Sequence, residues 1–243
     1  MLSVAKGVLL DWDGCIAVDN RILSSAKHLI AQHADRVAIV SNNSTHLPAD
    51  LEEILARHGI AFARERIFLA GVEALRDVAR SGAGRVLLLA APKMRNFART
   101  LGLRLVRDHP DVVVLMRDAR FTYGKLERAA NALRQGVPLV VANADRTHPG
   151  PGGRVVPETG SLLAALMACS GDLALEPRVI GKPGPLLFER ACDGLAIAPG
   201  QAVMIGDNPE TDGAGASRLG MTPILIGGSS SLGLEDLLEP VVA

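Results

Sequence analysis

Apolar and polar positions along this chain follow a pattern typical of a parallel α/β protein. Short apolar runs of strand length occur at residues 8–10, 37–40, 67–69, 86–90, 112–115, 139–141, 202–205 and 222–226. Between most of these runs, apolar residues recur at intervals of three and four, which predicts amphipathic helices. In Ser24–Ala34, for example, Ala26, Leu29 and Ile30 share one face. Alternating strands and helices predict an α/β fold built on parallel sheets.

The order of these elements predicts two structural parts. Further helices are predicted at residues 48–58, 92–101, 125–135 and 161–169, and a Gly/Pro-rich loop at residues 143–157. The middle of the chain starts its own series of strands and helices, and the pattern changes again after Pro177. We therefore expect a discontinuous core domain, residues 1–70 and 177–243, with a second α/β domain, residues 71–176, inserted into it.

Composition narrows the classes of partner. The chain has 243 residues, 48% of them apolar, which is ample for a packed core, and its 26 basic residues equal its 26 acidic residues. This balance argues against nucleic acid or an anionic membrane as the main partner. The three cysteines lack metal-ligand spacing and fit a reducing cytoplasm. The first apolar run is interrupted at Asp11, too early for a signal peptide, and no later run reaches membrane-spanning length.

Candidate chemistry begins where the first apolar run ends. Asp11-Trp12-Asp13-Gly14 places two carboxylates one residue apart, directly after a predicted buried strand. Ligands bind beyond the carboxyl ends of strands in parallel α/β sheets. Two carboxylates this close ionise together only when a cation lies between them. The same tetrapeptide also fits an ordinary turn, so by itself it does not decide the function.

Polar residues follow three other predicted strands in the same way. They are Ser41-Asn42-Asn43, Gly181-Lys182-Pro183 and the segment from Gly206 to Asp212, which contains Asp207. Taken singly, these segments also fit a turn, a solvated lysine and an acidic helix N-terminus. Taken together, a carboxylate pair, hydroxyl and amide donors, a lysine and a second acidic cluster are the groups that phosphoryl transfer requires.

With these segments in order, the chain resembles phosphatases of the haloacid dehalogenase (HAD) superfamily, subfamily IIA. All four superfamily motifs match, and the resemblance covers essentially the whole chain. The insert lies between the second and third motifs, as in NagD-type, p-nitrophenyl phosphate and pyridoxal phosphate phosphatases. Residues 121–126 and 159–162 of the insert are also similar to that branch. The resemblance implies a Rossmann-like parallel-sheet core with an inserted α/β cap domain.

The resemblance also implies roles for the acidic residues. Asp11 would be the nucleophile that forms an aspartyl-phosphate. Asp13 would protonate the leaving alcohol and then activate water. Mg²⁺ would be held by the Asp11 carboxylate, the backbone carbonyl of Asp13 and the Asp207 side chain, with Asp212 supporting the metal shell.

The remaining implied roles concern substrate binding. Ser41, Asn42, Asn43 and Lys182 would bind the phosphoryl group, and Lys182 would also steady the nucleophile. The insert would act as a cap that sets specificity, and residues 143–160 resemble the substrate-specificity loop of pyridoxal phosphatases. His148 is the cap candidate for touching substrate; a loop histidine exposed to solvent is the alternative.

These roles predict a Mg²⁺-dependent phosphatase for a small phosphorylated metabolite. Sugar phosphates, nucleotides, phosphoglycolate and pyridoxal phosphate are the substrate classes of the resembling branch, whose members often form homodimers through their caps. Two alternatives stay open: a non-catalytic phosphate-binding or signalling module of the same fold, and a phosphotransferase. Asp13 argues against the signalling module, because it supplies the base that hydrolyses the intermediate.

Overall fold

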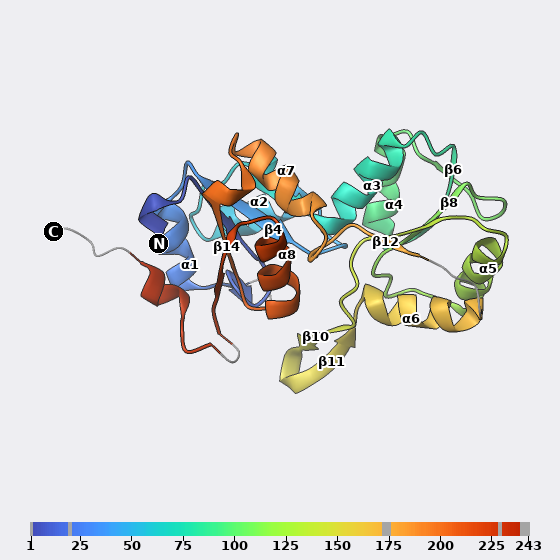
Figure 1. Ribbon diagram of the computed structural model, residues 1–243. Coiled ribbons are helices and arrows are strands. Elements are labelled where there is room, and N and C mark those ends of the chain that lie inside the picture. Colours follow the sequence, from blue (N-terminus) through green and yellow to red (C-terminus); the bar gives the residue numbers. More distant parts are fainter. Residues whose placement is uncertain (1, 19–20, 172–175, 228–229, 239–243) are drawn as a thin grey trace. The chain divides into compact units, whose positions relative to one another are not determined.

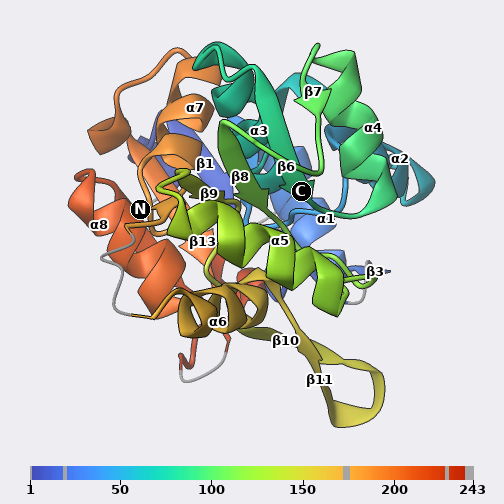
Figure 2. The ribbon, with the colours of Figure 1, turned by 90° about the vertical axis from the view of Figure 1, so that its right-hand side faces the viewer.

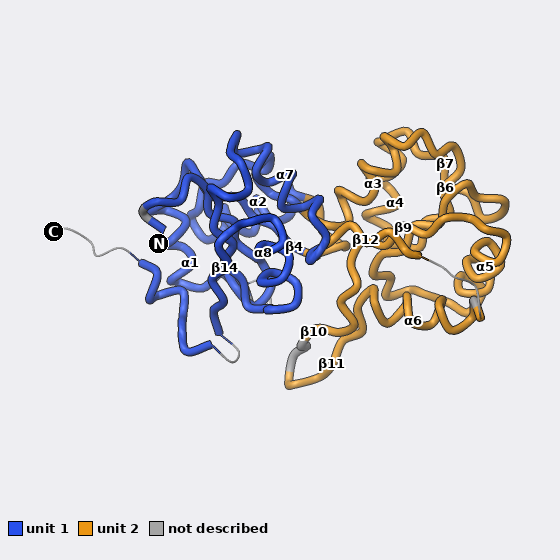
Figure 3. Tube along the Cα trace, viewed as in Figure 1, with its two compact units in different colours: residues 1–41, 48–68, 182–243 blue, residues 42–47, 69–181 orange. Residues whose placement is uncertain are grey.

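The chain folds into two compact units, which Figure 3 shows in different colours. The computed structural model describes residues 2–18, 21–171, 176–227 and 230–238. Unit 1 comprises residues 1–41, 48–68 and 182–243, and unit 2 comprises residues 42–47 and 69–181. Both units contain a parallel sheet, so the predicted α/β class is confirmed. Residues 42–47, 69–70 and 177–181, which we expected in the core domain, group with unit 2.

Unit 1 is built on a five-stranded sheet with the order β14-β13-β1-β4-β5. The strands are β1 (Gly7–Leu10), β4 (Val37–Ser41), β5 (Ile67–Leu69), β13 (Ala202–Gly206) and β14 (Thr222–Leu225). The β14–β13, β13–β1 and β1–β4 pairs are parallel. Every residue of β1, β4 and β13 is buried, because a parallel sheet is covered on both faces. This explains why these strands appear in the sequence as continuous apolar runs.

Helices connect the strands of unit 1 (Figure 1). They are α1 (Ser24–Gln32), α2 (Pro48–Arg57), α7 (Leu186–Gly194) and α8 (Ala214–Arg218). A short antiparallel pair, β2 (Ala17–Val18) and β3 (Arg21–Ile22), follows the first strand. The apolar stripe of α1 is Ala26, Leu29 and Ile30, as the sequence predicts, and all three residues are buried.

Unit 2 has its own five-stranded parallel sheet with the order β12-β9-β8-β6-β7. The strands are β6 (Arg85–Leu89), β7 (Arg104–Leu105), β8 (Val112–Leu115), β9 (Leu139–Val141) and β12 (Arg178–Val179). The helices are α3 (Ala70–Arg80), α4 (Pro92–Thr100), α5 (Tyr123–Arg134) and α6 (Thr159–Ser170). Alternate strand residues, such as Val113 and Leu115, point to one face and pack with buried residues of α5 and α6.

The segment predicted as a Gly/Pro-rich loop contains a β-hairpin that extends past the helices of its own unit (Figure 2). Strands β10 (Thr147–Gly150) and β11 (Arg154–Pro157) pair antiparallel, with His148 opposite Val156. Gly152 and Gly153 form the turn with φ of 70° and 72°, a conformation that glycine adopts without steric cost. The Gly/Pro-rich composition of this segment indicates a loop and does not reveal two strands of only four residues each. Among the described residues, no helix is long and apolar enough to cross a membrane.

Candidate active site

The candidate site of unit 1 begins at Asp11, the residue after β1. Its backbone N–H donates to the carbonyl of Ile205 in β13 at 2.9 Å, which continues the parallel ladder by one residue. Its Oδ1 accepts a hydrogen bond from the backbone N–H of Trp12 at 2.8 Å. The residue is buried. Asp11 is therefore held at the carboxyl end of the sheet, where ligands bind in folds of this kind.

The Lys182 side chain is only 2% exposed, and its ammonium contacts residues at or after the carboxyl ends of β1, β4 and β13. Its Nζ donates to Oδ1 of Asp11 at 2.6 Å and to the carbonyl of Val40 at 3.1 Å. The same Nζ lies 2.6 Å from Oδ1 of Asp212. A buried ammonium is stable only when carboxylates or carbonyls replace its water, and here they do.

The second acidic segment follows β13 and is shaped by a π-helical turn, Pro209–Gly213. Asn208 caps this turn, because its Oδ1 accepts from the backbone N–H groups of Glu210 and Thr211 at 2.9 and 3.3 Å. Asp212 is fully buried, and its Oδ2 accepts from the backbone N–H of Asn208 at 3.2 Å. The turn thus directs Asp212 back toward the end of β13. An acidic helix N-terminus was the ordinary alternative for this segment, and the sequence pattern does not indicate the wider turn.

Three carboxylates from both ends of the chain converge at this point. Oxygens of Asp11, Asp207 and Asp212 lie within 4.8 Å of one another. Gly14 has φ of 81°, and a Cβ at this position would collide with Oδ2 of Asp207. The turn after Asp13 therefore needs glycine both for its backbone conformation and for the close approach of the second acidic segment.

The electrostatics of the cluster show an excess of negative charge. Burial raises the pKa of the Asp11 carboxyl well above its usual range, although Lys182 lowers it. Burial also raises the pKa of Asp207, with a further contribution from Asp212. Burial alone would lower the pKa of Lys182, but the two adjacent carboxylates outweigh this effect and raise it. One lysine does not neutralise three acids.

This cluster fits a divalent cation. Its donors are carboxylate oxygens, which hard cations such as Mg²⁺ and Ca²⁺ prefer. A bound cation would also compensate the negative charge that Lys182 leaves unbalanced. The sequence predicted Asp11, Asp207 and Asp212 as ligands, and the structure brings all three together. The predicted contribution of Asp13 is its backbone carbonyl, and it stays a prediction.

Two other predicted site residues of unit 1, Ser41 and Asp13, are close in sequence to residues that form the cluster or bind Lys182. Ser41 is the buried last residue of β4, directly after Val40, whose carbonyl binds Lys182. Asp13 is an exposed residue in the turn after Asp11. Its charge contributes to the raised pKa of both Asp11 and Asp207. An exposed carboxyl next to the nucleophile candidate is open to exchange protons with solvent or substrate.

The predicted phosphate-binding asparagines belong to unit 2, where their side chains have protein partners. Asn42 Nδ2 donates to both carboxylate oxygens of Asp145, at 3.2 and 3.0 Å. Asn43 Oδ1 accepts from the backbone N–H groups of Thr45 and His46, both at 2.9 Å. The Asn43 contacts form an Asx turn, the ordinary alternative for this segment. Phosphate binding by either residue stays a prediction.

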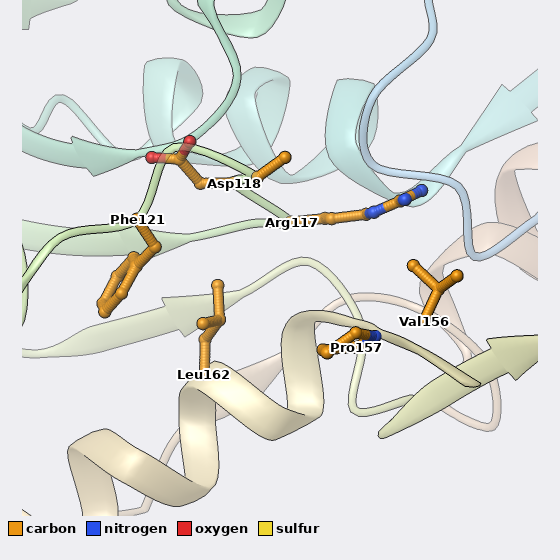
Figure 4. Close-up of a pocket in the computed structure, with 7 residues that line it drawn as sticks. Arg117, Asp118, Phe121, Val156, Pro157 and Leu162 are labelled. Carbon is orange, nitrogen blue, oxygen red and sulfur yellow. The ribbon is translucent and has the colours of Figure 1, made fainter. Parts of the chain in front are cut away.

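His148 lies in strand β10 of unit 2, and its side chain is 36% exposed. A pocket of about 340 Å³ lies in the same unit (Figure 4). The pocket is lined by Arg117, Asp118, Ala119, Phe121, Val156, Pro157 and Leu162. Val156 is the residue opposite His148 in the hairpin, so the imidazole stands on the same hairpin face as one pocket wall.

Sequence reasoning missed three residues that organise these segments: Asn208, Asp145 and Glu158. Asn208 had a usable signal, because an Asn directly before Pro favours a cap or turn. Asp145 binds Asn42 and Glu158 lies beside Arg117, and both partners come from distant parts of the chain, so no local spacing reveals these contacts.

Thiol reactivity offers a direct check on the burial in both units. Cys15 and Cys192 are buried, and burial raises the pKa of the Cys192 thiol to about 11, whereas Cys169 is exposed. We expect a disulfide reagent at pH 8 to modify one thiol per native chain, and all three after denaturation. Rapid modification of more than one thiol in the native protein would contradict this burial.

Comparison with known proteins decides the family. The family model for haloacid dehalogenase-like hydrolases matches residues 5–220. The chain belongs to this family. Chronophin from Rattus norvegicus is 35% identical, with 96% of this chain and 80% of the relative covered. The dihydroxyacetone phosphatase of Corynebacterium glutamicum is 26% identical, with 93% and 82% covered.

Solved structures of phosphatases share the fold. A glycerol phosphate phosphatase from Mycobacterium tuberculosis in complex with magnesium is 29% identical, with a TM-score of 0.81 over 92% of this chain and 68% of that chain. A 4-nitrophenylphosphatase from Thermotoga maritima has a TM-score of 0.88 over 99% and 98% of the two chains at 24% identity, which shows the fold alone. The predicted superfamily and enzyme class, a phosphoric monoester hydrolase, are confirmed. A divalent metal is consistent with these relatives and with the acidic cluster.

Proposed function

We propose that this protein is a Mg²⁺-dependent phosphatase that hydrolyses small phosphomonoesters through a phosphorylated Asp11. The observation that carries this proposal is the convergence of Asp11, Asp207 and Asp212 around one point, with Lys182 bound to the first of them. A nucleophilic carboxylate, a cation site and a fixed ammonium are the parts that phosphoryl transfer uses.

The reaction has two steps. In the first, a carboxylate oxygen of Asp11 forms a bond to phosphorus while the bond from phosphorus to the leaving oxygen breaks, and Asp13 donates a proton to that oxygen. In the second, Asp13 takes a proton from water, whose oxygen attacks phosphorus and releases inorganic phosphate from Asp11. The exposed position of Asp13 suits this exchange of protons.

The other charged residues hold the reacting groups in place. Lys182 orients the Asp11 carboxylate through its 2.6 Å hydrogen bond and adds positive charge for the phosphoryl oxygens. Asp207 and Asp212, with Asp11, would hold Mg²⁺. When bound, Mg²⁺ supplies positive charge that neutralises the phosphoryl group and the carboxylates. Ser41, at the end of β4, supplies a hydroxyl donor for a phosphoryl oxygen.

For the substrate, we propose a small organic phosphate of the sugar phosphate, nucleotide, phosphoglycolate or pyridoxal phosphate class. The names of relatives support small leaving groups, since they include a dihydroxyacetone phosphatase and a D-glycerol 3-phosphate phosphatase. We assign specificity, the role of a cap, to unit 2, with His148 as its substrate contact. A homodimer formed through this unit and a cytoplasmic location belong to the same proposal.

Removal of the metal tests the proposed function. We expect phosphate release from a panel of phosphomonoesters to stop when EDTA is added and to return when excess Mg²⁺ is restored, because the carboxylates of the buried Asp11 and Asp212 and the half-buried Asp207 then regain their counter-charge. The control is a sample that is treated with EDTA, freed of EDTA by buffer exchange and then reloaded with Mg²⁺. Undiminished release in EDTA would refute the metal-dependent mechanism. A long-lived acyl phosphate without phosphate release would instead identify a signalling module, and transfer to an added alcohol a phosphotransferase.

A further inference from the structure

Asn208 holds the π-helical turn of unit 1 through both its side chain and its backbone. Its Oδ1 accepts from the backbone N–H groups of Glu210 and Thr211, at 2.9 and 3.3 Å. Its backbone carbonyl accepts from the N–H groups of Asp212 and Gly213, at 2.9 and 3.2 Å. The bond from Gly213 joins positions i and i+5, which is the spacing of a π-helix. The turn therefore depends on one exposed residue at its start.

This wide turn fixes the carboxylate of Asp212. Its Oδ2 accepts a hydrogen bond from the backbone N–H of Asn208 at 3.2 Å, and its Oδ1 forms an ion pair with Nζ of Lys182 at 2.6 Å. A Cβ at Gly206 would collide with this carboxylate, so the carboxylate lies directly against the backbone of β13. Asp212 is also fully buried. The carboxylate consequently has little freedom to move.

The carboxylate of Asp207 is enclosed in a similar way. A Cβ at Gly14 would collide with its Oδ2, so the turn after Asp13 closes one side of it. Asp207 itself is half-buried. The carboxylates that would hold the cation are therefore confined by backbone, and they move apart only if the turn that carries them changes shape.

Confinement of this kind distinguishes Mg²⁺ from Ca²⁺. Mg²⁺ takes oxygens at about 2.0–2.1 Å in a nearly ideal octahedron, whereas Ca²⁺ takes about six to eight oxygens at roughly 2.3–2.6 Å in flexible arrangements. The larger ion needs carboxylates that can move outward or rotate to supply a second oxygen. A site whose carboxylates are held close together therefore favours the smaller ion.

We propose that Asn208 is a positioning residue that makes the cation site selective for Mg²⁺ over Ca²⁺: its side chain caps the π-helical turn, and the capped turn keeps Asp212 from moving outward around the larger ion. Asn208 does not itself bind the cation, because its Oδ1 already accepts two backbone hydrogen bonds. This inference rests on the proposed function, since it takes Mg²⁺ as the cation of this site, and it adds the residue that sets the choice of metal.

Titration calorimetry of the metal-free protein with MgCl₂ and with CaCl₂ measures this selectivity without turnover. We expect the ratio of the Kd for Ca²⁺ to the Kd for Mg²⁺ to fall about three- to tenfold in Asn208→Ala, an effect of the size that one helix cap supplies. Asn208→Ser should keep the wild-type ratio, because a serine hydroxyl also caps. The matched control is Asn131→Ala, which removes an exposed asparagine of α5 in unit 2 and should leave the ratio unchanged.

Hydrogen exchange of the Gly213 amide tests the proposed cause in the metal-free protein. This N–H closes the turn onto Asn208, so it should exchange faster in Asn208→Ala and at the wild-type rate in Asn208→Ser. An equal ratio of the two Kd values in the wild type and Asn208→Ala would overturn the inference. Equal losses of selectivity in Asn208→Ala and Asn208→Ser would overturn it too, because the cap would then not be the cause.

Three results separate this inference from the proposed function. If the wild type binds neither cation, both are wrong. If Asn208→Ala loses selectivity as expected but the wild type hydrolyses no phosphomonoester, the inference stands and the proposed function fails. If phosphate is released but the ratio of the two Kd values is the same in the wild type and Asn208→Ala, the inference is wrong and the phosphatase stands.

Discussion

Asp11→Asn is expected to lower the rate of phosphate release by more than roughly a thousandfold. An amide has almost the same shape as a carboxylate, so the hydrogen bond from the backbone of Trp12 can persist. The amide oxygen is a far weaker nucleophile, and no phosphorylated residue can form. The measurement is inorganic phosphate released in saturating Mg²⁺, with circular dichroism to show that the variant is folded.

A matched control makes this result specific. Asp35→Asn introduces the same chemical change at an exposed position of unit 1, after α1. We expect it to leave the rate unchanged. A phosphorylated protein species should be trapped by acid quenching in the wild type and in Asp35→Asn, and be absent from Asp11→Asn. Equal rates for the wild type and Asp11→Asn would exclude the carboxylate of this residue as the nucleophile.

The cluster around Asp11 could be predicted from the sequence for a simple geometrical reason. Parallel strands end at one edge of their sheet, so the residues after β1, β4 and β13 must lie near one another. The chain marks each of these ends by a change from apolar to polar residues, at Leu10, Val40 and Ile205. Short-range pattern and topology together are enough to bring Asp11 and Asp207 together without any knowledge of side-chain contacts.

The network of unit 2 could not be predicted in this way. Asn42 and Asp145 are 103 residues apart, and each lies in an irregular segment where no periodic pattern fixes which side chains face each other. The contact of Glu158 with Arg117 and His148 depends on the register of a hairpin that composition presents as a loop. Contacts between irregular segments follow from packing, which local sequence does not encode.

The family resemblance and the structure also contribute different information about Asn43. The resemblance places this residue in the phosphate-binding motif, whereas the structure shows its Oδ1 closing a turn with Thr45 and His46. The two observations are compatible if the turn orients backbone N–H groups while the amide shapes the loop. For Asn43, the sequence identifies the motif, and the structure shows that its Oδ1 already accepts two backbone hydrogen bonds.

Lys182→Met should destabilise the metal-free protein strongly as well as abolish most activity. Removing the ammonium leaves the buried Asp11 carboxylate and the carbonyl of Val40 without their donor, and the buried Asp212 carboxylate without its ion-pair partner. Breaking a buried pair in this way costs about 3–5 kcal/mol of unfolding free energy, which corresponds to a fall of roughly 10 °C in Tm for a chain of this size. Methionine is chosen because it keeps the length and apolar stem of the side chain.

The decisive measurement is the Tm of Lys182→Met with and without Mg²⁺, beside Lys27→Met, which changes an exposed lysine of α1. Mg²⁺ should reduce the deficit of Lys182→Met, because the cation replaces part of the missing positive charge. The deficit should also shrink as the pH falls, because burial raises the pKa of Asp11 and its protonation removes one of the unbalanced charges. Lys27→Met should melt like the wild type under all conditions. An equal Tm for Lys182→Met and the wild type, in EDTA at neutral pH, would contradict this account. It would mean that Asp11, Asp207 and Asp212 do not repel one another strongly when Lys182 is absent. Metal binding and the orientation of Asp11 would then need another explanation.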